Sequence, residues 1–153
     1  MSDEGTRVTI LVAEDDSEDR ILTKEALIVN NLANDLHFVG DGEELLDYLY
    51  QRGKYQNPAS SPRPGLLLLD LNMPRKDGRE ALQEIKADPT LRSIPVIVLT
   101  TSDSEDDIRD CYDLGANSYI TKPITFAGLI RAMRAVGQYW FGAVGLPSSV
   151  KRR

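Results

Sequence analysis

The 153-residue chain is poor in thiol and imidazole groups: it has one cysteine, Cys111, and one histidine, His37. A single thiol cannot pair within the chain, so a disulfide framework is excluded, and we expect a protein of the reducing cytoplasm. Neither residue has a second cysteine or histidine at metal-ligand spacing, which argues against a zinc site. A chain of this length can bury enough surface to fold without such cross-links.

Long apolar runs and an excess of positive charge are absent as well. No stretch reaches the roughly 18 apolar residues of a membrane-spanning helix, and the first residues, MSDEGTR, lack the apolar core of a signal peptide. Asp and Glu number 24 against 18 Lys and Arg, so the net charge is −6. This acidic balance argues against direct nucleic-acid binding, which needs a basic face. We therefore expect one globular domain with neither a membrane nor a nucleic acid as its partner.

Three apolar runs have the pattern of buried parallel strands, at residues 8–13, 65–70 and 95–100. The last two show no alternation of apolar and polar residues, which is typical of strands covered on both faces. Shorter strands are expected at 36–39 and 118–121, and segments with helical spacing lie between them. The order βαβαβαβαβα predicts an α/β fold, a doubly wound five-stranded parallel sheet with five helices.

Two connecting segments of this pattern need separate mention. The first predicted helix carries apolar residues at helical spacing: Ile21, Leu22, Ala26, Leu27 and Val29. The segment from 53 to 65, GKYQNPASSPRPG, is rich in proline and serine and is too long for an ordinary connection between a helix and a strand. Loops of that kind are either functional or mobile.

Residues with reactive side chains follow the predicted strands. In open parallel sheets, ligands bind beyond the carboxyl ends of the strands, where the strand order reverses. The residues at these ends are Glu14, Asp15, Asp70, Thr100 and Lys122. Carboxylates held a few ångströms apart repel by about 4 kcal/mol per pair at an effective dielectric near 20, so a shared cation is favoured.

An all-oxygen site of this kind suits Mg²⁺, which often works beside phosphate. Lys122 adds a fixed positive charge, so a phosphoryl group fits between the lysine and the metal ion, next to a hydroxyl. The central carboxylate, Asp70, can then act as a nucleophile and form an aspartyl phosphate.

Three functions are compatible with this fold, because fold alone does not determine function. The first is a phosphorylation switch that works as a binding module. The second is a Mg²⁺-dependent phosphohydrolase with an Asp nucleophile, but such enzymes usually carry a second acid two residues later, where this chain has Asn72. The third is a flavin carrier, which needs a phosphate-binding loop after the first strand instead of the acidic residues from 14 to 16.

Four motifs in this order carry a resemblance to a known family: ILVAEDD, LLLLDLNMPRKDG, PVIVLTTS and SYITKPIT. The chain resembles the receiver domain of bacterial two-component response regulators, and more closely the stand-alone regulators associated with phytochromes. The resemblance implies a flavodoxin-like receiver domain over residues 7–141, a C-terminal tail over 142–153 and no output domain. It also implies phosphorylation by a sensor histidine kinase, with a phytochrome as the expected kinase, and signalling through protein contacts rather than enzymatic turnover.

The resemblance assigns roles to the residues of the acidic cluster. It makes Asp70 the phosphoacceptor and Asp15 a direct Mg²⁺ ligand. Glu14 stands where the family has its other acidic residue and is expected to act on the metal ion through water. Asn72 is expected to supply its backbone carbonyl to the same ion.

The resemblance also assigns a switch. Thr100 is the hydroxyl that binds the phosphoryl group together with Lys122, and Tyr119 is the switch aromatic. The family has a cis peptide between this lysine and the following Pro123. Thr101 departs from the family pattern, because a smaller residue usually stands at that position.

A homodimer is expected from the end of the last predicted helix. Its inner stripe can be supplied by other residues, which leaves three aromatic side chains uncovered, those of Tyr139, Trp140 and Phe141. The resemblance places the dimer interface on the fourth helix, which ends before Gly115, on the strand at 118–121, and on the last helix with its extension. The alternative is that the extension folds back over its own helix.

Overall fold

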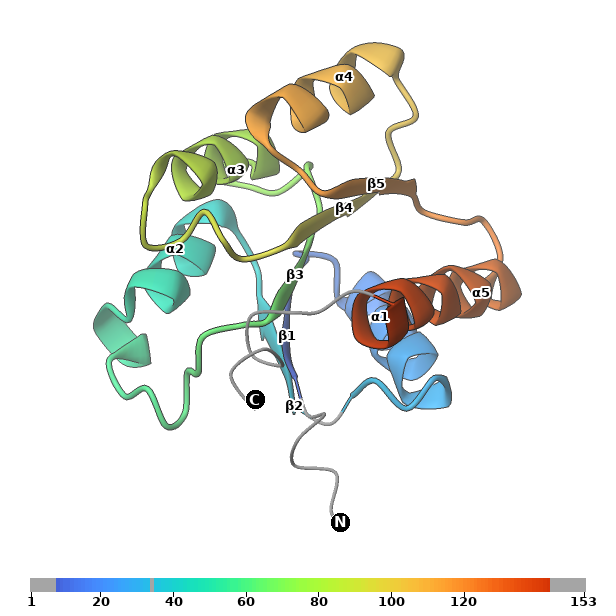
Figure 1. Cartoon of the computed structure of the whole chain (residues 1–153), viewed down its shortest axis with the longest axis horizontal. Coiled ribbons are helices and arrows are strands. Elements are labelled where there is room, and N and C mark those ends of the chain that lie inside the picture. Colours follow the sequence, from blue (N-terminus) through green and yellow to red (C-terminus); the bar gives the residue numbers. More distant parts are fainter. Residues whose placement is uncertain (1–7, 34, 144–153) are drawn as a thin grey trace.

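The computed structural model describes residues 8–33 and 35–143, and these form one parallel sheet flanked by helices (Figure 1). The sheet has five strands in the order β2-β1-β3-β4-β5. Their bounds are β1 (Thr9–Ala13), β2 (Asp35–Val39), β3 (Leu66–Leu69), β4 (Val96–Thr100) and β5 (Ser118–Thr121). All neighbouring strands pair in parallel, which confirms the predicted doubly wound α/β fold.

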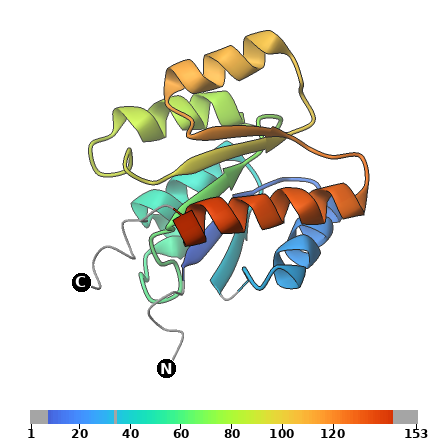
Figure 2. The same ribbon diagram turned by 45° about the vertical axis from the view of Figure 1, so that its right-hand side comes forward.

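Five α-helices cover the sheet on its two faces: α1 (Ser17–Val29), α2 (Gly42–Tyr50), α3 (Gly78–Ala87), α4 (Glu105–Leu114) and α5 (Phe126–Gly137). Helices α1 and α5 lie side by side on one face, and α2, α3 and α4 lie on the other (Figures 1 and 2). A short 3₁₀ helix, η2 (Gly53–Tyr55), follows α2, and a π-helical segment, η3 (Gln138–Ala143), continues α5.

The central strand β3 shows why its sequence has no alternation. Leu67 and Leu69 lie in the hydrophobic core beneath α2, α3 and α4, whereas Leu66 and Leu68 lie in the core beneath α1 and α5. All four side chains are buried. Both faces of β3 are therefore apolar, as expected of a strand that lies inside a sheet covered on two sides.

Polar side chains fix the starts of the helices that follow the strands. Asp16 accepts hydrogen bonds from the backbone N–H groups of Glu18 and Asp19 and caps α1. Asp77 and Glu80 form a reciprocal capping box at α3. Gly115 ends α4 in the left-handed conformation, as its position in the sequence predicts.

The insert between α2 and β3 is held against the domain. The Tyr48 hydroxyl donates to the carbonyl of Pro62 at 2.8 Å, and Arg63 donates to the carbonyl of Thr90 at 2.7 Å. The Gln51 side chain adds a bond to the carbonyl of Ser61, whose own side chain is buried. Contacts from both α2 and the loop after α3 thus fix this long segment.

Helix α1 differs from the predicted apolar stripe. Ala26 and Leu27 are buried, but Ile21, Leu22 and Val29 are exposed. The helix packs on the sheet beside α5, so only a narrow side of it is covered. The spacing of apolar residues predicted the helix correctly. It did not predict that Ile21, Leu22 and Val29 would be exposed.

The predicted domain end at residue 141 falls inside η3 and stays a prediction. Residue 7 and most of the predicted tail, 144–153, lie outside the described residues. None of the described helices combines the length and the apolar character needed to cross a bilayer.

Gly78 gives a test of the loop that follows β3. A Cβ atom at this position would lie 2.3 Å from the carbonyl oxygen of Asp70, so the backbone has to shift. We predict that Gly78→Ala lowers the free energy of unfolding in urea by about 1–3 kcal/mol, because overpacking strains a fixed backbone contact. Gly53→Ala is the control: its Cβ meets nothing within 4 Å, and only its positive φ of 60° opposes the change. A Gly78→Ala variant that is as stable as wild type would contradict the close approach.

Candidate functional site

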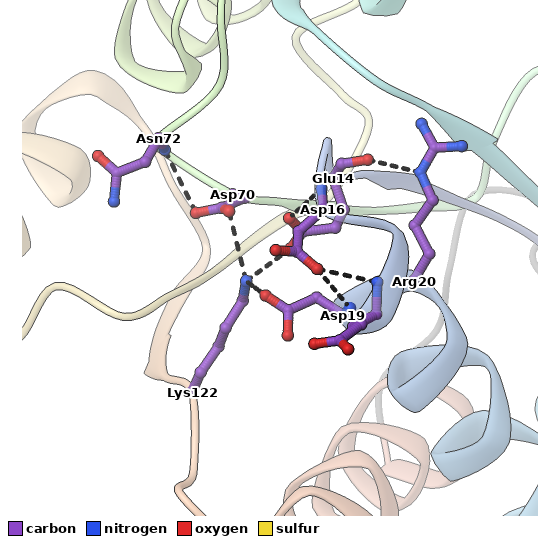
Figure 3. A network of polar contacts seen from close by, with 8 residues as sticks. Glu14, Asp16, Asp19, Arg20, Asp70, Asn72 and Lys122 are labelled. Atoms are coloured by element: carbon purple, nitrogen blue, oxygen red, sulfur yellow. Dashed lines mark hydrogen bonds and ion pairs between the residues drawn. The ribbon is translucent and has the colours of Figure 1, made fainter.

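The strand order brings three predicted residues together at the carboxyl edge of the sheet. Strand β1 lies between β2 and β3. The chain adds β2 on one side of β1 and the later strands on the other side, so the strand order reverses at β1. Glu14 follows β1 and Asp70 follows β3, and the ammonium group of Lys122 reaches both from the end of β5 (Figure 3). Its Nζ lies 2.6 Å from Glu14 Oε1 and 3.3 Å from Asp70 Oδ2.

The acidic cluster has the composition of a divalent-cation site. Carboxylate oxygens of Glu14, Asp15 and Asp70 all lie within 4.8 Å of one another. Glu14 and Asp70 are buried, whereas Asp15 is exposed, so the cluster opens to solvent on one side. Oxygen ligands with one open side fit a hard cation such as Mg²⁺ or Mn²⁺.

Burial and the neighbouring charges shift two pKa values in the cluster. Burial is the largest effect on Glu14, and together with the nearby Asp70 carboxylate it raises the pKa of Glu14 above its usual value, although Lys122 opposes the shift. Burial lowers the pKa of Lys122, but hydrogen bonds to Glu14 and Asp19 and the charge of Asp70 outweigh it, so the pKa is raised. Lys122 therefore stays charged over the whole physiological range.

Besides its ion pair with Lys122, Glu14 is held by three hydrogen bonds. Its backbone N–H donates to the carbonyl of Val39 at 2.9 Å, and its carbonyl accepts from Arg20 Nε at 2.7 Å. Its second carboxylate oxygen accepts from the backbone N–H of Asp16 at 3.1 Å. The side chain is thus oriented before any ligand binds.

The loop after Asp70 places Asn72 next to the acidic cluster. The backbone N–H of Asn72 donates to Asp70 Oδ1 at 3.3 Å (Figure 3). The N–H of Gly78 closes the loop by donating to the carbonyl of Leu71 at 2.9 Å. Met73 is buried below the loop and ties it to the core.

Thr100 ends β4 and is fully buried. Its hydroxyl is the one buried side-chain polar atom in the described part of the chain that has no hydrogen-bond partner. An unpaired buried hydroxyl costs about 1–3 kcal/mol, and such groups point to a ligand when they stand beside a site.

Tyr119 connects the β4–α4 loop to β5. Its hydroxyl donates to the carbonyl of Ser102 at 2.8 Å, and its half-buried ring packs against the core beneath α4. The Ser102 hydroxyl donates to Asp107 at 2.6 Å, and Asp107 pairs with Arg79 of α3 at 2.7 Å. A chain of polar contacts thus ties the loop that follows Thr100 to two helices.

One feature expected from the family is absent. The structure has no cis peptide among its described residues, so the bond between Lys122 and Pro123 is trans. The trans form of such a bond is intrinsically favoured by about 0.5–1 kcal/mol.

Two residues of the site were not predicted from the sequence. Asp19 Oδ2 accepts from Lys122 Nζ at 2.9 Å, and Arg20 fixes the Glu14 carbonyl (Figure 3). Both stand in the first turn of α1, six and seven residues after the end of β1. An acidic residue near a helix start is common for reasons of helix dipole and capping, so nothing in the sequence singles out Asp19.

The three aromatic residues predicted for an interface differ in exposure. Tyr139 is 55% exposed, whereas Trp140 is 8% exposed and lies in the core beneath α1 and α5. The expectation that the single chain leaves Trp140 uncovered is therefore wrong, because η3 folds its indole onto α5 and the sheet. Phe141 belongs to η3, but its side chain is not among the described parts of the structure.

Comparison with known proteins agrees with this geometry. The model of the response regulator receiver domain family matches residues 10–134. Response regulator Rcp1 from Synechocystis sp. is 43% identical over 150 residues, covering 97% of this chain and 100% of Rcp1.

Two crystal structures resemble the chain over most of its length. The Mn²⁺-bound form of Rcp1 is 43% identical and has a TM-score of 0.83, covering 92% of this chain and 99% of that chain. The phosphorylated cyanobacterial phytochrome response regulator RcpA is 45% identical and has a TM-score of 0.85, with the same coverage.

These relationships support a signalling domain that a kinase phosphorylates on an aspartate, and they give no support to a phosphohydrolase. By its sequence and its fold, the chain belongs to the response regulator receiver domain family.

Proposed function

We propose that Asp70 accepts a phosphoryl group from the phosphohistidine of a sensor kinase. A carboxylate oxygen of Asp70 attacks phosphorus, the P–N bond breaks, and the histidine nitrogen leaves with the bonding electron pair. The observation that carries this proposal is the unpaired buried hydroxyl of Thr100, on the strand next to the one that ends at Asp70. A phosphoryl oxygen on Asp70 is a partner of the right chemistry for that hydroxyl.

Mg²⁺ fits the acidic cluster of Glu14, Asp15 and Asp70, where Asp15 and Asp70 would hold it directly and Glu14 through water. The family resemblance adds the backbone carbonyl of Asn72 as a further ligand. When bound, it would neutralise the charge of the carboxylates and of the phosphoryl oxygens. The Mn²⁺-bound form of Rcp1 supports a divalent cation at such a cluster. The oxygen-only donor set and the single solvent-exposed carboxylate, Asp15, favour Mg²⁺, which keeps several waters.

Lys122 and Thr100 have complementary roles in this proposal. Lys122 supplies a fixed positive charge within 3.3 Å of Asp70, which stabilises the negative charge on the phosphoryl oxygens. Thr100 supplies a hydroxyl donor. Movement of Thr100 toward the phosphoryl group is passed to Ser102, two residues later, and from there to Tyr119 through the bond of 2.8 Å.

This chain offers the kinase an apolar surface beside the site, on which the kinase can dock. A hollow between α1 and the start of α5 is lined by Leu22, Ile124 and Phe126 and borders Lys122. These three apolar side chains are exposed, as is Ile21, which precedes Leu22 in α1. A helix that carries the phosphohistidine can cover this surface while its histidine reaches Asp70. The resemblance to RcpA supports a phytochrome as the kinase. The single cysteine of the chain favours a cytoplasmic location.

A second interface is proposed on α4, β5, α5 and η3. A hollow there is lined by aromatic and apolar side chains, among them Tyr112, Tyr119 and Tyr139. Tyr112 and Tyr139 are exposed. Because Tyr119 belongs both to this face and to the switch, a homodimer formed here would respond to phosphorylation.

The phosphoacceptor is tested by Asp70→Asn. We predict that wild type gains one labile phosphoryl group from acetyl phosphate and Mg²⁺, and that the variant gains none, because the amide lacks the nucleophilic oxygen. Intact mass spectrometry measures the gain, and an excess of chelator should abolish it in wild type. Full phosphorylation of the variant would place the acceptor elsewhere.

Thr100→Val tests the unpaired hydroxyl. Because the hydroxyl has no partner in the protein, we predict that the variant is as stable as wild type in urea, or more stable by about 1 kcal/mol. The same change should weaken binding of beryllofluoride, a phosphoryl analogue, roughly tenfold. Thr101→Val, at the exposed next position, should alter neither quantity. A clear loss of stability in Thr100→Val would show that the hydroxyl already has a partner.

The dimer is tested on the exposed tyrosines. We predict that the full chain sediments as a dimer at micromolar concentration and that the double variant Tyr112→Ala and Tyr139→Ala sediments as a monomer, because both rings leave the interface. Ile28→Ala removes an equally exposed apolar side chain from α1 and should leave the dimer intact. A wild-type chain that stays monomeric with and without phosphorylation would refute the interface.

A further inference from the structure

Lys122 uses all three of its N–H donors on carboxylates. Its Nζ lies 2.6 Å from Glu14 Oε1, 2.9 Å from Asp19 Oδ2 and 3.3 Å from Asp70 Oδ2 (Figure 3). An ammonium group has three hydrogens, so no donor remains. Glu14 and Asp70 stand at strand ends, whereas Asp19 reaches the lysine from the first turn of α1.

Asp19 differs from the other two carboxylates in what else it contacts. Glu14 and Asp70 share the acidic cluster with Asp15, and each also accepts a backbone N–H bond. Among the described residues, Lys122 is the one partner of the Asp19 carboxylate. Asp19 can therefore bind the lysine whether or not the acidic cluster holds a cation.

Cation binding in the cluster changes the surroundings of Lys122. A divalent cation in the cluster would offset the negative charge of Glu14 and Asp70, so that these carboxylates would attract the lysine less, and it would repel the ammonium group. Lys122 is 13% exposed and stands at the end of a strand, so the repulsion would turn its side chain toward solvent unless another group held it. The bond to Asp19 would remain, because Asp19 lies outside the acidic cluster.

We propose that Asp19 is a positioning residue that keeps Lys122 beside Asp70 when the acidic cluster holds its cation, so that one lysine donor faces the incoming phosphoryl group. This inference rests on the proposed function, since it assumes a phosphoryl group on Asp70. Asp19 itself touches neither the phosphoryl group nor the acidic cluster.

The proposal predicts a result opposite in sign to that of simple electrostatics. Removal of a negative charge near an anion-binding site should tighten anion binding if the charge acts only through space. If Asp19 positions Lys122, Asp19→Asn should instead weaken binding of beryllofluoride, because the lysine is no longer held at the site.

The experiment measures the dissociation constant of beryllofluoride by calorimetry on the full chain at saturating Mg²⁺. We expect Asp19→Asn to bind roughly fivefold more weakly than wild type, given a charge-assisted bond at a partly exposed site. Glu18→Gln is the matched control: Glu18 stands in the same first turn of α1, is exposed, and should bind as wild type does. Asp19→Glu keeps the charge and should recover most of the loss.

A second readout separates positioning from damage to the acidic cluster. The affinity for Mg²⁺ alone should change less than about threefold in Asp19→Asn, because Asp19 is not part of the cluster. Beryllofluoride binding by Asp19→Asn that equals or exceeds that of wild type would overturn the proposal, and so would a parallel loss of Mg²⁺ affinity. Failure of wild type itself to bind beryllofluoride would count against the phosphoryl site on Asp70, and with it this inference.

Discussion

The bond network of Lys122 is the constraint on which the site depends. Two buried carboxylates, Glu14 and Asp70, cannot stand side by side in the carboxyl edge of the sheet without a positive charge between them. Lys122 supplies that charge, and its raised pKa reflects the carboxylates that hold it. The compensation is incomplete, because Asp15 and Asp19 add two further negative charges around one ammonium group. This excess of negative charge favours a divalent cation in the cluster. The positive charge of Lys122 favours an anion beside Asp70.

The topology converts distant residues into this network. Glu14 and Lys122 are 108 residues apart in the sequence, yet their side chains meet because parallel strands all end at one edge. The same edge contains Thr100, whose hydroxyl is buried and unpaired. Beyond it, the contacts from Ser102 to Tyr119 and from Asp107 to Arg79 extend the site to α3, α4 and the face proposed for dimerisation. These contacts begin at Ser102, two residues after Thr100, while the Thr100 hydroxyl itself stays without a hydrogen-bond partner beside Asp70.

The sequence predicted the parts of this arrangement that follow from topology. Apolar runs without alternation located the inner strands. The residues that follow strands, Glu14, Asp70 and Lys122, were predicted to form the site because the carboxyl ends of parallel strands converge. Features that depend on side-chain reach could not be predicted: Asp19 is an ordinary acidic residue of a helix start until its carboxylate is seen on Lys122. The predictions for Trp140 and Ile21 failed for a related reason: Trp140 is buried and Ile21 is exposed, and helical spacing does not show how much of a helix its neighbours cover.

The most direct test of the account is to locate the phosphoryl group on the wild-type chain. Borohydride reduces an acyl phosphate to an alcohol, so a phosphorylated aspartate becomes homoserine and can be mapped by tandem mass spectrometry. The account predicts homoserine at residue 70 alone, in protein treated with acetyl phosphate and Mg²⁺. Homoserine at another acidic residue, or its absence from protein whose intact mass shows the phosphoryl group, would contradict the central role of Asp70.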